Sequence, residues 1–309
     1  MKSFFRIYLL SFLFISGMTF LSCSNSDPST PEPEQPEPSP DDPSSGGSGG
    51  DQGDDTGSTN DPSDDDEDAW TLLFEDDFDT DDSTEPDPDK WVLCERGDKT
   101  WNRNMSESYK QAYIENGSLF LIGELVDGKY LTGGIETRGK FDFQYGKVEC
   151  RARFARRPKG NHTGIWMMPA PPAEEWPKSG EIDIMEHLND ESIIYQTVHN
   201  WYADDMGHSD KPKAQGTAEI DNQDWNIYGI IWNADSITYT VNGEKYLTYP
   251  NLHLSGDDAQ YQWPFDHPFY LILSQSLGGE DTWEGPIDNS ELPAEFEIDY
   301  IKVWQRSEE

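Results

Sequence analysis

The sequence predicts an all-β domain in which two antiparallel sheets pack face to face. Two features carry this prediction. Apolar and polar residues alternate over many short stretches, and turn-forming pairs such as Asn116-Gly117, Gly133-Gly134 and Gly278-Gly279 separate those stretches. The pattern contains no convincing amphipathic helix. A region of this kind from residue 69 to residue 309 has the length of one β-sandwich.

The segment from Gly146 to Phe154 shows the clearest alternation. Apolar residues occupy every second position, and charged residues fill the positions between them. Val148, Cys150, Ala152 and Phe154 thus alternate with Lys147, Glu149, Arg151 and Arg153. This is the pattern of an antiparallel strand with one buried face and one solvated face.

Two further strand predictions follow from the C-terminal half. Asn242-Gly243 separates two alternating runs, and this pair is a strong signal for a type I′ β-hairpin. In the last strand we expect two apolar faces and therefore burial on both sides. One face would carry Phe296, Ile298 and Tyr300, and the other Ile301 and Val303.

Three carboxylates, those of Glu181, Asp183 and Glu186, occur within six residues of another predicted strand. Because strand side chains alternate, Glu181 and Asp183 share a face and Glu186 should point the other way. A β-bulge at Ile184-Met185 would turn Glu186 onto the face of the other two. Two carboxyls about 5 to 5.5 Å apart across a sugar are what a retaining glycosidase needs, one as nucleophile and one as general acid.

A solvated acidic strand face is the alternative explanation of these six residues. The preceding stretch from Gly164 to Gly180 is rich in Trp, Pro and Gly, as the rim of a carbohydrate cleft would be. Such a stretch is costly on a plain surface, so it favours the site.

Residues 1–22 are expected to be a lipoprotein signal peptide. Lys2 and Arg6 come before an apolar stretch, from Ile7 to Leu21, that is too short to span a bilayer. Ser22 directly before Cys23 resembles a bacterial lipobox, which implies that Cys23 becomes the lipidated first residue of the mature protein. Cleavage by a signal peptidase at another position, without a lipid, is the alternative.

Residues 23–68 are expected to form a disordered acidic linker behind the lipidated cysteine. From residue 24 the segment has 15 acidic residues and no Lys, Arg or aromatic residue, so it cannot bury enough apolar surface to fold. An acidic tract after a lipobox cysteine resembles the export signals of Bacteroidetes surface lipoproteins. That resemblance implies anchoring in the outer membrane with the domain outside the cell; a plain solvated spacer is the alternative.

Charge and cysteines limit the partners and the chemistry. The formal net charge of −39 should repel nucleic acid, anionic lipid and densely sulfated polymers, and it favours a neutral partner. Cys94 and Cys150 could form one disulfide or remain two buried thiols. The position of Cys150 on an apolar strand face favours the thiols.

Five segments of the chain together resemble one known family. They are Phe74–Asp79, Gly146–Arg153, Trp166–Pro169, Gly180–Glu186 and Ile298–Trp304. The family is glycoside hydrolase family 16, and the resemblance extends from Trp70 to Arg306. It implies a β-jelly roll of two curved antiparallel sheets with a substrate cleft on the concave face. The spacing of the acids, with Met185 as the extra residue, is similar to the laminarinase-like branch.

The resemblance also implies roles for the acids. Glu181 would be the nucleophile, and Glu186 the general acid and then the base that activates water. Asp183 would keep one glutamate protonated by like-charge repulsion or hydrogen-bond the nucleophile. His199 is expected on the next strand beside these acids, with a core or surface position as the alternative.

Aromatic and amide side chains are the expected sugar contacts. Aromatic faces match the apolar faces of pyranose rings, which suggests Trp166, Trp176 and Trp283, although core packing would also explain each of them. By the resemblance, Asn102 and Asn104 would bind the sugar on the non-reducing side. Asp77, Gly117 and Asp299 match places where many members hold a structural calcium. Catalysis is expected to need no cofactor.

We therefore expect a monomeric, retaining endo-β-glycanase that cleaves β-1,3- or mixed-linkage β-1,3/1,4-glucan. The stretches Leu273–Gly279 and Trp201–His208 differ from the usual glucanase pattern. An endo-β-galactosidase that acts on galactose-containing glycans of mucin, keratan or galactan is therefore the alternative. A non-catalytic carbohydrate-binding lipoprotein is the second alternative, but a binding module has no use for a costly buried group of like charges.

Overall fold

The structure is a computed structural model that describes residues 70–80, 84–256 and 258–307. The predicted signal peptide, the lipidated Cys23 and the acidic linker lie outside the described residues. Within the described ranges, no helix has the length and apolarity needed to cross a membrane.

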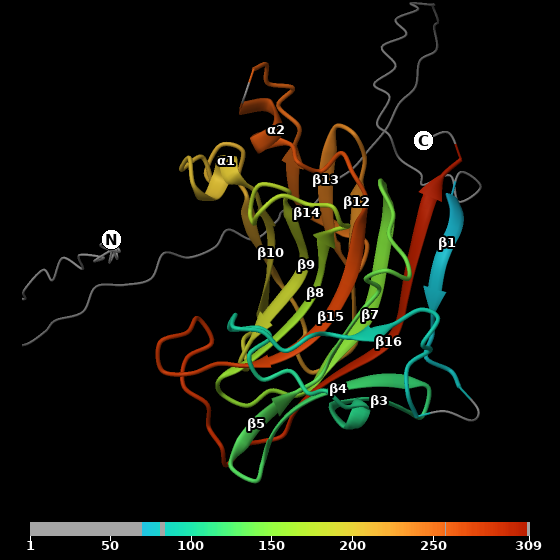
Figure 1. Ribbon diagram of the computed structural model, residues 1–309, viewed down its shortest axis with the longest axis vertical. Helices are drawn as coiled ribbons and strands as arrows, with labels where there is room; N and C mark the ends of the chain where they lie inside the picture. The colour runs from blue at the N-terminus through green and yellow to red at the C-terminus, as the bar shows by residue number, and fades with distance from the viewer. Residues whose placement is uncertain (1–69, 81–83, 257, 308–309) are drawn as a thin grey trace, which may run out of the picture. The chain divides into compact units, whose positions relative to one another are not determined.

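Two antiparallel sheets form the domain, as the sequence predicted (Figure 1). The nine-stranded sheet has the order β14-β13-β12-β7-β16-β4-β3, with β1 paired to β16 and β5 paired to β4. Its strands are β1 (Trp70–Asp76), β3 (Ala112–Glu115), β4 (Ser118–Val126), β5 (Lys129–Thr132), β7 (Gly146–Arg156), β12 (Asn226–Trp232), β13 (Ser236–Val241), β14 (Glu244–Pro250) and β16 (Ala294–Arg306).

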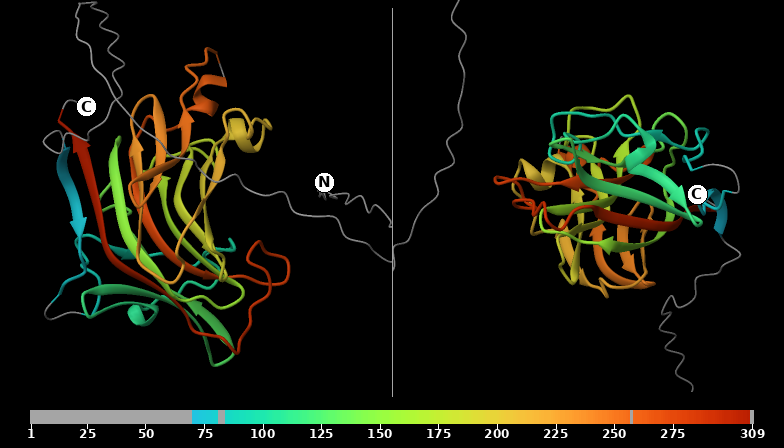
Figure 2. Two further views of the ribbon diagram at one scale, coloured as in Figure 1. Left: turned by 180° about the vertical axis from the view of Figure 1, so that it is seen from behind. Right: turned by 90° about the horizontal axis from the view of Figure 1, so that it is seen from below.

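The seven-stranded sheet has the order β11-β10-β9-β8-β15-β6-β2. Its strands are β2 (Val92–Leu93), β6 (Gly134–Glu136), β8 (Asn161–Pro169), β9 (Glu181–Leu188), β10 (Ile193–His199), β11 (Gln215–Glu219) and β15 (Phe269–Leu277). The described helices are short: η2 (Tyr109–Gln111), α1 (Trp201–Asp204) and α2 (Asp258–Gln262). The long strands β15 and β16 curve visibly along the domain (Figures 1 and 2).

The core lies between the two sheets and is largely aromatic and aliphatic. The predicted inward residues of β7 are buried: Val148, Cys150, Ala152 and Phe154. They belong to one cluster with Ile165 and Met167 of β8 and with Ile182 of β9. The inner faces of both sheets are therefore occupied, mostly by apolar side chains, and His187 of β9 also packs there, with its ring stacked on Phe154 at 3.8 Å.

The predicted hairpin is present between β13 and β14. Asn242 has φ 52° and Gly243 has φ 83°, the positive values that a type I′ turn requires at both central positions. The prediction for the last strand was wrong in one respect. The register of β16 against β7 shifts between Ile298 and Tyr300, so Asp299 is an extra residue in the strand.

This bulge in β16 changes which residues share a face. Phe296, Ile298, Ile301 and Val303 all lie in the core, whereas Tyr300 is only half-buried. One face of β16 therefore packs in the core, and Tyr300 lies on the other, which is not the second apolar core face that we expected.

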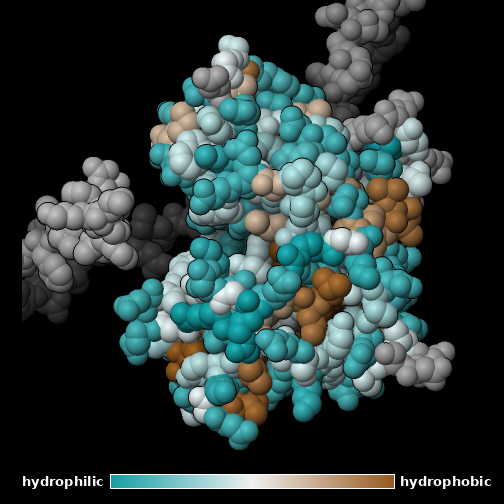
Figure 3. All heavy atoms as spheres, in the orientation of Figure 1, coloured by the Kyte–Doolittle hydropathy of each residue, from teal (hydrophilic) through white to brown (hydrophobic). Residues whose placement is uncertain are grey.

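Both described cysteines are free and buried, so the two-thiol alternative is confirmed. Burial raises the pKa of the Cys94 thiol well above its usual value. The face seen in Figure 3 is mostly hydrophilic and shows several separate apolar patches. This surface agrees with the acidic composition of the chain.

Candidate active site

The predicted β-bulge is present in β9. Glu186 lies opposite Gly164 of β8 and Asp183 lies opposite Trp166, so Ile165 alone faces both Ile184 and Met185. The register against β10 shifts at the same place. Ile184 and Met185 are both fully buried in the core. The extra residue therefore brings the three acids onto one face.

These acids line a cleft of about 890 Å³ on the outer face of the seven-stranded sheet. The cleft walls come from β8, β9, β10 and β15 and from three loops. The lining side chains are those of Lys99, Thr100, Trp101, Asn102, His162, Trp166, Met168, Glu175, Trp176, Glu181, Asp183, Glu186, His199, Tyr270, Ile272, Ser274, Trp283 and Glu284. This volume lies in the range of ligand-binding clefts.

Asp183 is the most deeply buried of the three acids. Burial, followed by the charges of Glu181 and Glu186, raises the pKa of Asp183 well above its usual value. Its hydrogen bond with Glu181 acts in the same direction. Asp183 is therefore the acid that keeps its proton and donates it toward Glu181. The sequence prediction gave Asp183 two roles. The hydrogen bond to the nucleophile agrees with the structure, whereas the charge that keeps a glutamate protonated is opposite to it.

Three neighbouring groups stabilise the ionised form of the Glu181 carboxyl group. Burial raises the pKa of Glu181, but the positive charge of His199 and hydrogen bonds from Trp176 and Asp183 oppose this. The indole Nε1 of Trp176 donates to Glu181 Oε2 over 2.7 Å. A buried carboxylate that accepts hydrogen bonds in this way is suited to act as a nucleophile.

His199 lies on β10 directly opposite Glu181, as predicted. Its Nε2 is 3.5 Å from Asp183 Oδ2, and its Nδ1 is 3.1 Å from Asp204 Oδ1. Asp204 is held there by helix α1, whose first turn is capped by the Asn200 side chain. Burial by itself lowers the pKa of His199, but Asp204 and the charge of Glu181 outweigh it and raise it to about 8.

We expect the pKa of His199 to fall toward the ordinary imidazole value of about 6.5 in an Asp204→Asn variant. The amide cannot stabilise the protonated ring as the carboxylate does. An NMR titration of the His199 ring measures this shift. Asp235→Asn is the matched control because Asp235 pairs with the exposed His253 at 3.1 Å. An unchanged His199 titration in Asp204→Asn would contradict the assigned cause.

The predicted tryptophans occupy two different kinds of position. Trp166 is nearly buried in the cleft floor, where its ring meets that of Trp101 edge-on at 4.8 Å and its Nε1 donates to Ser274 Oγ over 3.1 Å. Trp176 and Trp283 are about half exposed at the rim, at 51% and 50%. All three predicted tryptophans line the cleft.

The two predicted asparagines are separated by the structure. Asn102 lines the cleft, but Asn104 does not. The Asn104 side chain instead donates to the carbonyl oxygen of Leu277 over 3.4 Å. Its position is explained by this loop contact.

Comparison with known proteins agrees with the fold and the cleft. Residues 98–302 match Glycosyl hydrolases family 16. The chain belongs to this family. It is 38% identical over 218 residues to a keratan-sulfate endo-1,4-beta-galactosidase of Sphingobacterium multivorum. That alignment covers 68% of this chain and 50% of the relative, so the chain spans half the length of that protein.

Two solved structures of similar proteins match this chain over nearly their whole length. One comes from work on endo-acting O-glycanases with which human gut bacteria initiate mucin breakdown. It has a TM-score of 0.68 and 32% sequence identity, and the match covers 75% of this chain and 98% of that one. The other is the laminarinase from Rhodothermus marinus, with a TM-score of 0.67, 29% identity and coverage of 77% and 98%.

This family 16 cleft contains two charged residues that sequence reasoning missed. His162 lies on β8 four residues before Trp166, and the alternation of strand side chains could have placed it on the same face. Glu284 lies in the long loop between β15 and β16, next to Trp283. His162 contacts both Glu186 and Glu284, and it is therefore part of the acid cluster.

The stretches that differ from the glucanase pattern do not all reach the cleft. Ser274 lines it, but the buried side chain of Gln275 donates to Asn161 Oδ1. None of the residues from Trp201 to His208 is among those that line the cleft. This segment acts on the site indirectly, through the contact of Asp204 with His199.

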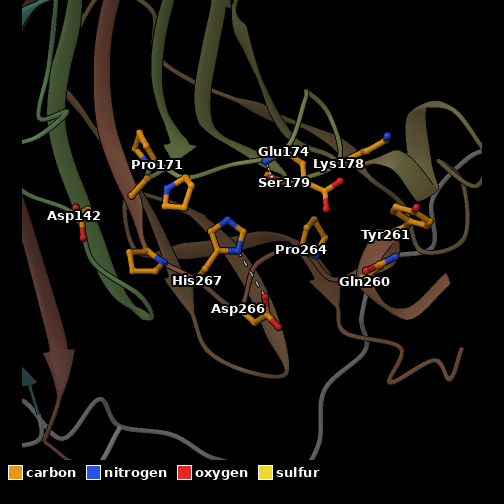
Figure 4. A pocket seen from close by; sticks show the side chains of 13 residues that line it. Asp142, Pro171, Glu174, Lys178, Ser179, Gln260, Tyr261, Pro264, Asp266 and His267 are labelled. Carbon is orange, nitrogen blue, oxygen red and sulfur yellow. Dashed lines mark hydrogen bonds and ion pairs between the residues drawn. The ribbon is translucent and has the colours of Figure 1, made fainter. Parts of the chain in front are cut away.

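A second pocket, of about 460 Å³, contains none of the predicted catalytic residues (Figure 4). Pro171, Glu174 and Lys178 line one side of it, and Tyr261 and His267 lie across from them (Figure 4). The loop that supplies the first group also supplies Glu175 and Trp176 to the cleft.

The calcium site at Asp77, Gly117 and Asp299 stays a prediction. The carboxylate of Asp299 is already paired with the guanidinium of Arg151, Oδ2 to Nη1, at 2.6 Å. Asp77 accepts a hydrogen bond from the backbone of Asp79. In the described part of the chain, the acids and histidines near enough to one another to share an ion are Glu181, Asp183 and His199, which belong to the cleft.

Proposed function

We propose that this protein is a retaining endo-β-glycanase with Glu181 as nucleophile and Glu186 as acid/base. The observation that carries the proposal is the bulge in β9, which turns Glu186 onto the face of Glu181 and Asp183. A cleft with two catalytic carboxyl groups on one face and exposed tryptophans on its rim suits the cleavage of internal bonds of a long glycan. Membership of a family of glycosyl hydrolases supports the same conclusion.

In this mechanism Glu181 attacks the anomeric carbon while Glu186 gives its proton to the departing glycosidic oxygen. A covalent glycosyl-enzyme forms. Glu186, now a carboxylate, takes a proton from water, and the water attacks the anomeric carbon and releases Glu181. Trp176 and Asp183 donate hydrogen bonds to Glu181, so they stabilise the carboxylate before attack and again as it departs.

For the substrate we propose a neutral, galactose-containing glycan such as those of mucin or keratan. The support is the 38% identity to a keratan-sulfate endo-1,4-beta-galactosidase and the match over 98% of a structure from work on mucin O-glycanases. The strongly acidic chain favours unsulfated stretches of such glycans.

A β-1,3- or mixed-linkage glucan is the second candidate. The laminarinase from Rhodothermus marinus matches with nearly the same TM-score and also over 98% of its length. A purely glycan-capturing role is disfavoured because it gives no reason to gather three acids and two histidines in one cleft, with Asp183 buried.

The deciding experiment is incubation of the protein with laminarin, mixed-linkage glucan, unsulfated keratan and mucin O-glycans. We expect oligosaccharides of several sizes from keratan or mucin, since an endo-acting enzyme cuts internal bonds. Products only from laminarin or mixed-linkage glucan would assign the cleft to glucose. Binding to a glycan without any product would overturn the enzymatic proposal.

For the location we propose the outer membrane, with the domain outside the cell and Cys23 carrying the lipid. The sequence around Ser22-Cys23 and the acidic tract behind it support this. Cells grown with an alkyne-labelled fatty acid should label the wild-type protein but not a Cys23→Ser variant. Label retained in the variant would place the lipid elsewhere, and resistance of the domain to protease added to intact cells would place it inside.

A further inference from the structure

His162 lies between two carboxylates at the end of the cleft that holds Glu186. Its Nε2 is 3.1 Å from Glu186 Oε1, and its Nδ1 is 3.2 Å from Glu284 Oε1. Ser276 Oγ of β15 is also 3.2 Å from Nδ1. The Glu284 side chain is only 3% exposed, and that of His162 is 13% exposed. Both ring nitrogens therefore have an acidic partner, and one of these partners is buried.

Two carboxylate partners favour a charged imidazole. Burial by itself lowers the pKa of His162, but the hydrogen bonds and charges of Glu186 and Glu284 outweigh it and raise it to about 9. Burial acts to raise the pKa of Glu284, but the contact with His162 lowers it to about 2. At neutral pH His162 is therefore a cation that donates both of its N–H groups, and Glu284 is its permanent counterion.

We propose that His162, held in place by Glu284, is a positioning residue for the acid/base Glu186. The imidazolium N–H occupies Glu186 Oε1, which leaves Oε2 as the oxygen that carries the catalytic proton. This inference rests on the proposed role of Glu186. It adds to that role the choice of the reacting oxygen and a built-in counterion.

His162 and Glu284 also compensate the charge of Glu186 in both steps of the proposed reaction. When Glu186 gives its proton to the glycosidic oxygen, it becomes an anion beside the cation of His162, so the developing charge is stabilised. Glu284 compensates the positive charge of His162, so Glu186 does not face an unpaired cation. His162 keeps its own proton throughout, so only the proton of Glu186 moves.

The other groups near Glu186 do not duplicate this function. Glu181 and Asp183 lie on the same strand, and His199 lies on the neighbouring strand β10, where it contacts Asp183 and Asp204. From β15 the packed partner of His162 is Ser276, which carries no charge. Glu284 is therefore the counterion that acts on Glu186 through His162.

The test compares the pH dependence of kcat/KM in His162→Gln and Glu284→Gln. The high-pH limb reports the loss of the proton that the acid must hold. In His162→Gln the cation is gone, so we expect this limb to move up by about one pH unit or more. In Glu284→Gln the cation is uncompensated, so we expect the limb to move down, by about half a unit. Opposite shifts are not expected from a loss of structure.

Ser276→Ala is the matched control, because it removes an uncharged partner from the same ring nitrogen. Its high-pH limb should stay in place. A substrate with a dinitrophenyl leaving group needs no proton from Glu186, so bond cleavage in His162→Gln should be close to wild type with it. The NMR signals of the His162 ring report whether the charge is present in folded Glu284→Gln and Ser276→Ala.

Two results would overturn the inference: limbs that do not move, or limbs that move in the same direction in both glutamine variants. A loss of activity that is equal for natural and dinitrophenyl substrates would also assign His162 a merely structural role. Failure of the proposed function is a separate result, since it would appear as wild-type turnover in a variant that lacks Glu186.

Discussion

A Glu181→Ala variant is expected to lose turnover by about four to six orders of magnitude, because no covalent glycosyl-enzyme can form without the attacking carboxylate. Steady-state release of reducing ends from the preferred glycan measures this. The fold should persist, because the residue that is shortened lies in the cleft and not in the core between the sheets. We expect its unfolding temperature to remain within a few degrees of that of the wild type.

The product formed with azide distinguishes a missing nucleophile from a damaged site. In Glu181→Ala, azide can enter the space left by the carboxylate and displace the leaving group once, which gives an α-glycosyl azide. The exposed Glu244 of β14 provides the control, since Glu244→Ala should leave turnover unchanged. Activity near wild type in Glu181→Ala would remove Glu181 from the mechanism and with it the retaining assignment.

Replacing Glu186 by alanine should produce a loss that depends on the leaving group. With the natural glycan, which needs a protonated leaving oxygen, we expect kcat/KM to fall by about two to four orders of magnitude. With a dinitrophenyl glycoside, the first step should remain fast, and the glycosyl-enzyme should accumulate because no base activates water. A burst of dinitrophenol followed by a slow steady state is the expected signal.

Azide should accelerate the slow phase of Glu186→Ala and yield a β-glycosyl azide, since it attacks the glycosyl-enzyme from the face that Glu186 occupied. The anomeric configuration of this product, opposite to that from Glu181→Ala, assigns the two glutamates to the two faces of the sugar. An equal loss of rate for both leaving groups would mean that Glu186 does not supply the proton.

Much of the fold could be predicted because it depends on local patterns. Alternation predicted the buried face of β7 correctly. The hairpin was predicted because a type I′ turn requires positive φ at both central residues, which Asn242 and Gly243 can adopt. Alternation failed in β16, where one extra residue at Asp299 inverts the pattern. The same irregularity was predicted correctly in β9, because there three acids on one face gave a chemical reason to expect it.

The charged partners of the acids could not be predicted in the same way. Glu284 contacts His162 from a loop that begins more than a hundred residues later in the sequence. The position of the Glu284 side chain depends on how that loop folds over the sheet. Asp204 meets His199 only because Asn200 starts a helical turn. Alternation also could not show that burial would make Asp183 the acid that keeps its proton. These properties arise from packing between segments that are distant in sequence.

Because of the bulge in β9, the number of residues between two acids in the sequence does not by itself tell whether their side chains lie on the same face. Strand side chains obey an even-or-odd rule, and the bulge adds one to that count between Asp183 and Glu186. A strand without Met185 and without the bulge would present its acids on one face again, whereas losing the bulge alone would hide Glu186 in the core. The extra residue and the irregular pairing therefore form a compensating pair, and in evolution they must be gained or lost together.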